Sequence, residues 1–406
     1  MIAATDREPN TPVIYFDYAA TSWPKPAAVR TALNDYFGEA GGNPGRSGHQ
    51  MSIAAARVVL EAREAVARLF NVSDPGRIVF TKNATEALNL AIYGLLRPGD
   101  HVVTSSLEHN SVMRPLRHLE AQGVEVTVVA CSPAGLLDSN DVRHALRPDT
   151  RLLVTTHGSN VVGTLLPIGE LAAVAHERGV PYLVDTAQTA GSIPIDVEAL
   201  GVDLLAFTGH KGLLGLTGTG GLYVRDGLGL QPLMRGGTGS DSALEFQPDF
   251  MPDIYESGTL NVAGLAGLAA GVRFLCEIGI ESVAAHEREL VARFLAGAAE
   301  IPGLSLYGPE DPAQRCGVVS FNIAGLVPSE VSTILDRPFG IMSRPGLHCA
   351  PSAHRTLGTF PTGTVRFSVG WFNTSAEIDA AVGVLRDVAE WVTVQRVLPG
   401  PIPTET

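Results

Sequence analysis

Charged residues are scarce in this chain of 406 residues: they make up 17% of it, against 45% for hydrophobic residues. Disordered proteins combine low hydrophobicity with high charge, so this composition indicates a folded protein with a large core. Lys and Arg together number 29 and Asp and Glu 42, which leaves a net charge of −13. This shortage of positive charge argues against nucleic acid and against an anionic membrane surface as partners.

Long apolar runs and cysteine motifs are missing as well. No apolar run approaches the roughly 18 residues of a membrane helix, and the first ten residues, MIAATDREPN, lack the apolar segment of a signal peptide. No Cys-x-x-Cys pair occurs, so neither a disulfide framework nor a metal site is expected from the four cysteines, Cys131, Cys276, Cys316 and Cys349. We therefore expect a cytoplasmic protein with no membrane segment and no bound metal.

Between about residues 78 and 225, short apolar segments alternate with stretches of helical length. This pattern is typical of a mostly parallel sheet covered on both faces. The predicted strands are Ile78–Phe80, His101–Ser106, Val124–Ala130, Leu152–Thr156, Tyr182–Asp185, Leu204–Phe207 and Gly221–Val224. The last two lie too close in sequence for a helix between them, so one strand is expected to be antiparallel. We predict a large doubly wound α/β domain over residues 26–262, with its ligands at the carboxyl ends of the strands.

After residue 261 the pattern changes. Two long helical stretches come first, and strands and a final helix follow them: Val262–Ile278, Ser282–Glu300, Val318–Ile323, Val365–Val369 and Ala376–Val392. This order predicts a smaller α+β domain, formed by residues 1–25 and 263–406.

One lysine stands at the end of a predicted buried strand, in LLAFTGHKGLLGLTGTGG (residues 204–221). A surface lysine is the ordinary case, but a lysine held in a partly desolvated pocket has a lowered pKa and can form a Schiff base. Asp185 ends another apolar strand, where a carboxylate is costly unless it is paired. The two residues suit pyridoxal phosphate, because Asp185 can pair with its pyridine nitrogen and Lys211 can react with its aldehyde. Asp185 alone could equally cap a helix or bind a metal.

The segment FTKNATEA (residues 80–87) ends a predicted strand and begins a helix near Thr85. Backbone amides at a helix N-terminus, together with a hydroxyl group, make a seat for phosphate. Ser, Thr or Asn at a helix start is also ordinary capping. The order of phosphate seat, aspartate and lysine along the chain is therefore more informative than any one of the three.

On these residues the chain resembles the fold-type I, class V aminotransferase-like family of pyridoxal-phosphate enzymes, and within it the cysteine desulfurases. The resemblance covers nearly the whole chain, from YFDYAA (15–20) to FNT (372–374), and includes THGSNVVGT (156–164), DTAQ (185–188), TGHK (208–211) and SGTLN (257–261). The specific segment is RPGLHCA (344–350), which looks like the nucleophile segment of the group II enzymes and selenocysteine lyases. Leu347, where a histidine is common, and Thr186, where a glycine is frequent, depart from the pattern.

The resemblance implies a role for each matching position. Lys211 would hold the cofactor and move protons, Asp185 would pair with the pyridinium nitrogen, and Gln188 would donate to the phenolic oxygen. His109 would stack on the ring and could shuttle protons. Further cofactor contacts would come from Ala84, Thr85, Asn160, Thr208, His210 and, from the partner subunit of a homodimer, Thr259. The substrate would be bound by Asn160 and Arg366, with Arg344 and His49 as weaker candidates in the wall of the site.

Cys349 decides which reaction is expected. It follows His348 in the loop SRPGLHCAPSAH, where Arg344, His348 and His354 could supply the electropositive setting that a reactive thiolate needs. The resemblance implies that L-cysteine becomes L-alanine and that its sulfur passes to Cys349 as a persulfide. An acceptor protein or a small thiol would then take the sulfur. The other three cysteines are expected to be structural.

Other readings of the same residues stay open. A selenocysteine lyase or a cysteine-sulfinate desulfinase on this scaffold would need less help from Cys349. A class V aminotransferase or epimerase would need Lys211 but no thiol. A non-catalytic protein that kept the fold is the alternative from another class, and it would not bind the cofactor.

Overall fold

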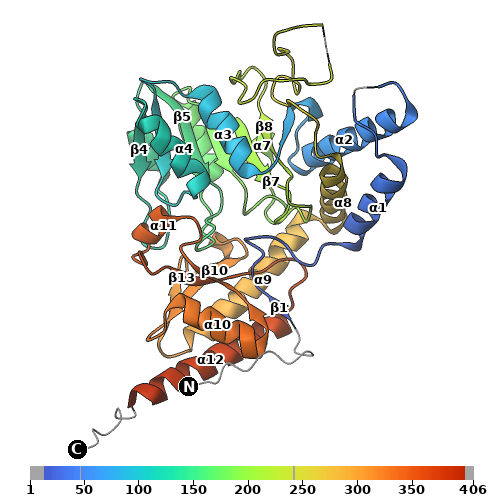
Figure 1. The fold of residues 1–406 in the computed structure, drawn as a ribbon. Coiled ribbons are helices and arrows are strands. Elements are labelled where there is room, and N and C mark those ends of the chain that lie inside the picture. The colour runs from blue at the N-terminus through green and yellow to red at the C-terminus, as the bar shows by residue number, and fades with distance from the viewer. Residues whose placement is uncertain (1–12, 46, 241–242, 398–406) are drawn as a thin grey trace, which may run out of the picture.

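The structure is a computed structural model that describes residues 13–45, 47–240 and 243–397. Its larger part surrounds a seven-stranded sheet, and its smaller part surrounds a four-stranded sheet. The two parts lie one above the other in Figure 1, with the C-terminal helix on the far side of the smaller part.

The seven-stranded sheet has the order β2-β8-β7-β6-β5-β3-β4. Its strands are β2 (Ile78–Thr81), β3 (His101–Ser105), β4 (Glu125–Val129), β5 (Thr150–Thr156), β6 (Tyr182–Asp185), β7 (Leu204–Thr208) and β8 (Gly220–Val224). β8 is antiparallel to both of its neighbours, and the other neighbouring pairs are parallel. The predicted mostly parallel sheet with one antiparallel strand is confirmed.

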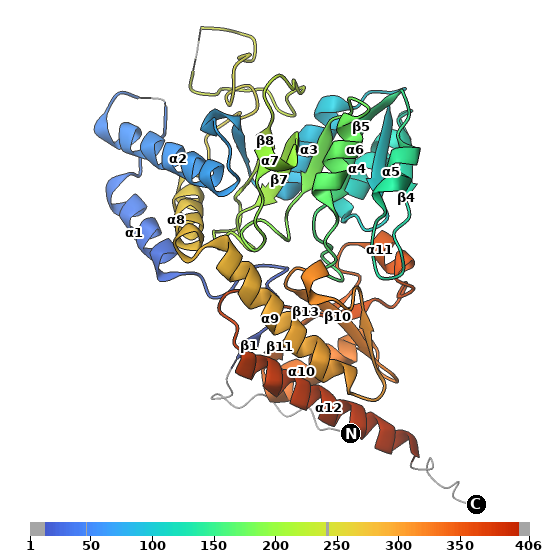
Figure 2. The same cartoon turned by 180° about the vertical axis from the view of Figure 1, so that it is seen from behind.

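Successive apolar residues of the central strands serve opposite faces of this sheet, because side chains alternate along a strand. Leu152 packs on one face and Leu153 on the other. The first face is covered by α3 (Ala84–Leu95) and α4 (Asn110–Glu120), in front in Figure 1. The second face, seen in Figure 2, is covered by α2 (Gln50–Leu69), α5 (Ser139–Ala145), α6 (Ile168–His176), α7 (Val197–Leu200) and α8 (Val262–Ile278).

The smaller part has an antiparallel sheet in the order β12-β13-β10-β9. Phe294, Phe321 and Phe367 pack ring against ring in its core, with centroids 5.0–5.6 Å apart. β1 (Ile14–Tyr15) pairs with β11 (Ile341–Met342), which brings the N-terminal segment to this part.

The remaining elements are α1 (Ala27–Glu39), η1 (Pro75–Arg77), α9 (Ile280–Ala299), β9 (Leu304–Tyr307), η2 (Pro312–Gln314), β10 (Val318–Ile323), α10 (Pro328–Phe339), β12 (Arg344–Gly346), α11 (Pro351–Thr356), β13 (Thr364–Ser368) and α12 (Ser375–Val397).

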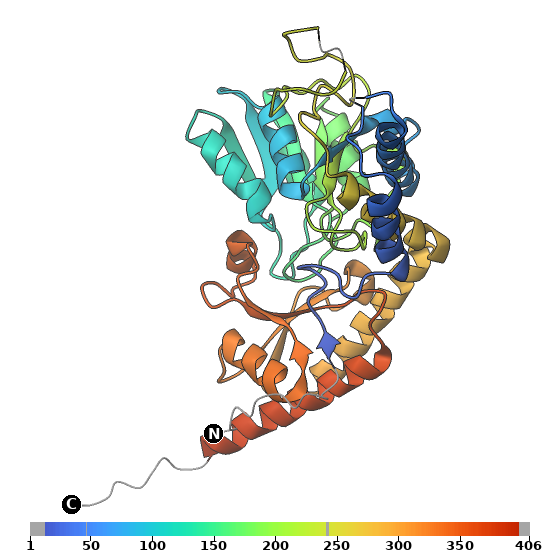
Figure 3. The ribbon, with the colours of Figure 1, turned by 45° about the vertical axis from the view of Figure 1, so that its right-hand side comes forward.

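The packing of α8 bears on the predicted domain boundary at residues 262 and 263. Leu265, Leu268 and Val272 of α8 belong to the core of the larger part, whereas α9 contributes Phe294 to the core of the smaller part. The two helices meet at an angle of 81°, which Figure 3 shows. We therefore propose that the larger domain extends through α8 to the bend. Residues 1–12 and 398–406 of the predicted ranges lie outside the described residues.

Among the described residues, no single helix is long and apolar enough to cross a membrane. The bent pair of α8 and α9 meets the criteria of length and composition when the two helices are taken together.

A buried ion pair joins α2 to the segment that precedes α8. The guanidinium of Arg63 donates to both carboxylate oxygens of Glu256 at 2.9 Å, and both side chains are less than a tenth exposed. Glu256 also accepts from the backbone N–H of Phe80 at 2.6 Å, and Arg63 also donates to the carbonyl of Ile78 in β2. Three segments distant in sequence are therefore connected by two charges that water does not solvate.

We expect Glu256→Gln to lower the free energy of unfolding by about 3 kcal/mol, because it leaves the buried Arg63 without its counter-charge. The matched control is Glu120→Gln, which breaks the exposed Arg117–Glu120 pair of α4 and should cost less than about 1 kcal/mol. Urea unfolding of the three proteins measures the difference. Equal losses in the two variants would contradict the importance of the buried pair.

Candidate active site

The carboxyl ends of β2, β3, β5, β6 and β7 share one edge of the large sheet, because β8 is the only reversed strand among the seven. A pocket opens at this edge, where ligands of doubly wound sheets bind. It is lined by Asn83, Ala84, Thr85, His109, Ser111, Thr156, Gly158, Asn160, Asp185, Ala187, Gln188, Thr208, His210 and Lys211. The fold thus brings together all the predicted cofactor contacts except Thr259.

Lys211 and Asp185 give this pocket a positive and a negative charge. Asp185 is the last residue of β6 and is almost fully buried, and its Oδ1 accepts from the backbone N–H of Ala187 at 2.9 Å. Burial raises the pKa of Asp185, against the opposing effects of that N–H and of Lys211. Burial lowers the pKa of Lys211 to about 8, although the charge of Asp185 acts in the other direction. Lys211 is therefore partly a neutral amine, and so nucleophilic, near neutral pH.

His109 begins α4 and lines the same pocket. Its Nδ1 accepts from the backbone N–H of Ser111 at 3.0 Å and lies 2.7 Å from the Ser111 hydroxyl. Burial, together with the positive charges of Lys211 and Arg344, lowers the pKa of His109 to about 4. Because Nδ1 acts as an acceptor, we assign the ring proton to Nε2. His109 is thus a neutral imidazole with one N–H to offer.

The N-terminus of α3 forms the seat that was predicted for a phosphate. Asn83 caps the helix by accepting from Glu86 N–H, and the Thr85 hydroxyl lies 2.9 Å from that of Ser111. Gly220 of β8 allows the turn to approach, since a Cβ there would lie 2.7 Å from Asn83 backbone atoms. His210 adds a buried Nδ1 that has no hydrogen-bond partner within the described residues. Helix amides, a hydroxyl and an unsatisfied imidazole nitrogen together suit an anion.

The groups in this pocket fit pyridoxal phosphate. The amine of Lys211 suits its aldehyde, and the carboxylate of Asp185 suits its ring nitrogen. The start of α3, Thr208 and His210 suit its phosphate. Gln188 also lines the pocket, and its amide donates to the carbonyl of Ala19 at 3.2 Å.

Arg366 of β13 reaches this region from the smaller part. Its guanidinium is only 1% exposed. It donates to the backbone carbonyl of Asn160 at 2.9 Å and to the carboxylate of Asp17 at 2.8 Å. Its Nε has no partner among the described residues. The Asn160 side chain donates to the carbonyl of His348 at 2.6 Å, so it links the pocket to the loop that contains Cys349.

The loop of Cys349 lies between β12 and α11. His348 and Cys349 both have a left-handed backbone conformation, with φ of +48° and +58°. Residues other than glycine rarely adopt this conformation. The carbonyl of Cys349 accepts from the N–H of Asn110 at 2.8 Å, and His348 is held by Asn160. These bonds offset a strained backbone and keep the Cys349 side chain exposed. Arg344 places Nη2 3.8 Å from the Cys349 sulfur.

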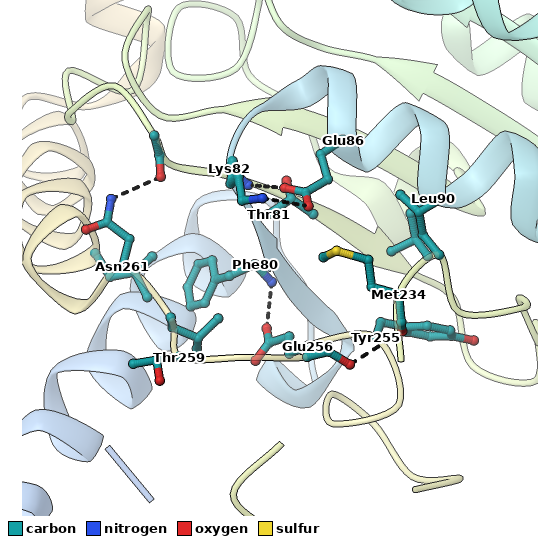
Figure 4. Close-up of a pocket in the computed structure, with 15 residues that line it drawn as sticks. Phe80, Thr81, Lys82, Glu86, Leu90, Met234, Tyr255, Glu256, Thr259 and Asn261 are labelled. Atoms are coloured by element: carbon teal, nitrogen blue, oxygen red, sulfur yellow. Dashed lines mark hydrogen bonds and ion pairs between the residues drawn. The ribbon is translucent and has the colours of Figure 1, made fainter. Parts of the chain in front are cut away.

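Two predicted residues lie elsewhere in the same chain. Thr259 is exposed beside a different pocket, where Figure 4 shows it near Phe80 and Glu256. His49 is exposed at the start of α2 and caps that helix by accepting from Ser52 N–H. Neither lines the pocket of Lys211, and the predicted arrival of Thr259 from a partner subunit stays a prediction.

Sequence reasoning assigned no role to two acids of the site, the half-buried Asp17 and the buried Glu108. Asp17 is the partner of Arg366. Glu108, next to His109, has its pKa raised to about 8 by burial and accepts from the Ser105 hydroxyl and from Thr156 N–H. Asp17 stands inside YFDYAA, a segment that carries the family resemblance. A charged residue within an otherwise apolar matching segment was the available signal.

Comparisons with known proteins agree with this geometry. Residues 14–381 match the family model described as Aminotransferase class-V. A probable cysteine desulfurase of Methanothermobacter thermautotrophicus is 40% identical, over 93% of this chain and 94% of that protein. The apo structure of a cysteine desulfurase from Thermococcus onnurineus NA1 has a TM-score of 0.88 and 36% identity, covering 93% of this chain and 95% of that one.

A second solved structure, the cysteine desulfurase CsdA (S-sulfonic acid) from Escherichia coli, has a TM-score of 0.82 and 31% identity, covering 93% of this chain and 94% of that one. The chain therefore belongs to the aminotransferase class V family. Within that family its relatives are cysteine desulfurases, and it belongs with them.

The lowered pKa of Lys211 leads to a prediction for the cofactor-free protein. The rate at which Lys211 captures pyridoxal phosphate should rise with pH and reach its midpoint near 8 instead of the ordinary 10.5, because the neutral amine is the nucleophile. Asp185→Asn should move the midpoint to lower pH, since it removes a negative charge that favours the protonated amine. Borohydride trapping at a series of pH values, read by peptide mass spectrometry, measures this.

The chain provides its own control, because it has only three lysines, Lys25, Lys82 and Lys211. Lys82 is exposed and forms a long contact to Glu86. Trapping at Lys82 should be slower than at Lys211 near pH 8. A midpoint above 10 at Lys211 would show that its amine is not desolvated.

Proposed function

We propose that this protein is a pyridoxal-phosphate-dependent cysteine desulfurase, which converts L-cysteine to L-alanine and carries the sulfur on Cys349 as a persulfide. The observation that carries the proposal is the placement of an exposed cysteine, with Arg344 at 3.8 Å, in a loop bonded to the pocket of Lys211. The exposed sulfur can therefore be reached by a substrate, and the Arg344 guanidinium lies next to it.

The cofactor, when bound, supplies an aldehyde for the substrate amine and a ring that withdraws electrons from Cα. The residues that would hold it are Lys211, Asp185, Thr208 and His210, with the start of α3. Their arrangement before any ligand arrives lowers the cost of ordering them during the reaction.

Arg366 would bind the substrate carboxylate. Its planar fork matches a carboxylate better than a lysine would, and its Nε is unsatisfied. Asp17 and the carbonyl of Asn160 hold the guanidinium in one orientation from two other sides. The substrate would thus be oriented with its side chain toward the Cys349 loop.

Two groups would handle protons. Lys211 can accept or release a proton at Nζ near neutral pH, because its pKa is lowered to about 8. His109 is neutral near pH 7, because its pKa is lowered to about 4, and it can donate a hydrogen bond from Nε2. A proton that the ring accepts is released again readily, because the low pKa disfavours the charged form.

In the sulfur transfer, the Cys349 thiolate attacks the substrate sulfur. A sulfur–sulfur bond forms while the carbon–sulfur bond of the substrate breaks. The electron pair of the broken bond goes to carbon, which takes up a proton, so that alanine leaves and Cys349 keeps one extra sulfur. No external oxidant or reductant is needed for this step.

We also propose that two chains form a homodimer in which Thr259 reaches the cofactor pocket of the partner. This is supported by the exposure of Thr259 and by its position outside the Lys211 pocket of its own chain.

We expect Cys349→Ser to lower alanine formation from L-cysteine by on the order of 100-fold or more, because loss of a nucleophile leaves only the contribution of binding. Cys276→Ser is the matched control: Cys276 is also exposed, but it lies on α8, away from the pocket. This control should keep wild-type activity. The assay quantifies alanine and sulfide, with the mass of one added sulfur sought at Cys349.

Other results would identify another reaction. Unchanged sulfide release by Cys349→Ser would remove the nucleophile and favour a lyase or desulfinase, which parallel assays with selenocysteine and cysteine sulfinate would detect. A keto acid in place of alanine would identify an aminotransferase.

A further inference from the structure

A second pocket lies on the outer side of Cys349. It is bounded by α3 and α4, and it shares Thr85, His109 and Ser111 with the cofactor pocket. Cys349 lines this second pocket and does not line the first. Cys349 therefore lines a pocket that adjoins the pocket of Lys211.

The charge in this outer pocket is positive. Arg114 of α4 lines it, and none of its nine lining residues carries a carboxylate. Within the described part of the chain, the side chain of Arg114 makes no hydrogen bond or ion pair. The side chain of Arg344 donates a hydrogen bond to the Cys349 sulfur and to no other described group. By contrast, Arg117, on the same helix, is paired with Glu120. One guanidinium without an ion-pair partner among the described residues thus lines the pocket of the exposed thiol, and a second lies 3.8 Å from its sulfur.

The lining also indicates the size of the ligand. None of the exposed large apolar side chains belongs to this pocket. Protein-binding surfaces usually bury apolar or aromatic anchors, and the pocket's Tyr93 is only partly exposed. A small anionic molecule suits the pocket better than a protein does.

We propose that the outer pocket binds the sulfur acceptor, that this acceptor is a small thiol with a carboxylate, and that Arg114 binds the carboxylate. The proposal rests on the proposed function, because it requires a persulfide on Cys349. The acceptor thiolate attacks the outer sulfur, and a new sulfur–sulfur bond forms on the acceptor. The bond to Cys349 breaks, its electron pair stays on Cys349 as a thiolate, and the acceptor leaves as a persulfide.

The first experiment measures discharge of a preformed persulfide. The holoprotein is treated with L-cysteine, freed of excess substrate, and mixed with 3-mercaptopropionate, 2-mercaptoethanol or cysteamine. Loss of the added sulfur from Cys349 is followed by mass spectrometry. Each thiol is compared with itself across variants, so that differences in intrinsic thiol reactivity cancel.

We expect Arg114→Gln to slow discharge by 3-mercaptopropionate roughly five-fold, the effect of one exposed charge pair at contact distance. Discharge by the neutral thiol should not change, and discharge by cysteamine should not fall. Arg117→Gln removes an equal charge from the same helix and should leave all three rates unchanged. The proposal would be overturned if Arg114→Gln slowed discharge by all three thiols equally. It would also be overturned if Arg117→Gln slowed discharge by 3-mercaptopropionate alone. A wild-type persulfide that only an added protein fraction discharges would also overturn it.

A second measurement keeps this proposal separate from the proposed function. Cys349 is modified by anionic dithiodipropionate, neutral bis(2-hydroxyethyl) disulfide or cationic cystamine, which requires no turnover. Arg114→Gln should slow only the anionic reagent. If no persulfide forms but this selectivity is found, the desulfurase assignment fails and the anion site remains. If persulfide forms and the selectivity is missing, the desulfurase assignment stands and the acceptor site is wrong.

Discussion

The structure depends on keeping an amine and a carboxylate together away from water. Asp185 and Lys211 each follow a buried strand of the large sheet, and burial acts against the charge of both groups. A parallel arrangement of strands makes this possible, because it collects strand ends, helix N-termini and their polar groups along one edge. Burying Lys211 and Asp185 costs free energy. The burial of apolar side chains in the surrounding sheet offsets this cost.

The second constraint is the joining of two cores. The larger part holds the pocket of Lys211, and Arg366 comes from β13 of the smaller part. Cys349 lies between them, in the loop from β12 of the smaller sheet to α11, whose Ala353 packs in the larger core. Asn160 connects the parts with both its carbonyl and its side chain, which contact Arg366 and the His348 carbonyl. Asn160, which lines the pocket of Lys211, thus also positions the loop of Cys349. A shift between the parts would move both Arg366 and the loop of Cys349 relative to the pocket of Lys211.

Much of the fold followed from periodicity. All seven strands of the large sheet could be predicted, because strands buried on both faces leave continuous apolar runs between helices. The end of the larger core was harder to predict. The sequence predicts α8 in the smaller domain, since a long helix after the last strand carries no mark of which core it joins. Its packing against α1 and α2 supports our proposal that the larger domain extends through α8.

By itself, the sequence determined the fold class and pointed to Lys211 and Asp185, because strand ends are local features. His109 was implied by the family resemblance. Only the tertiary structure decided which charges are paired. Asp17 and Arg366 are 349 residues apart and form an ion pair, whereas no described acidic residue from any segment pairs with Arg114. Pairing depends on distances between segments, and no local pattern records those distances.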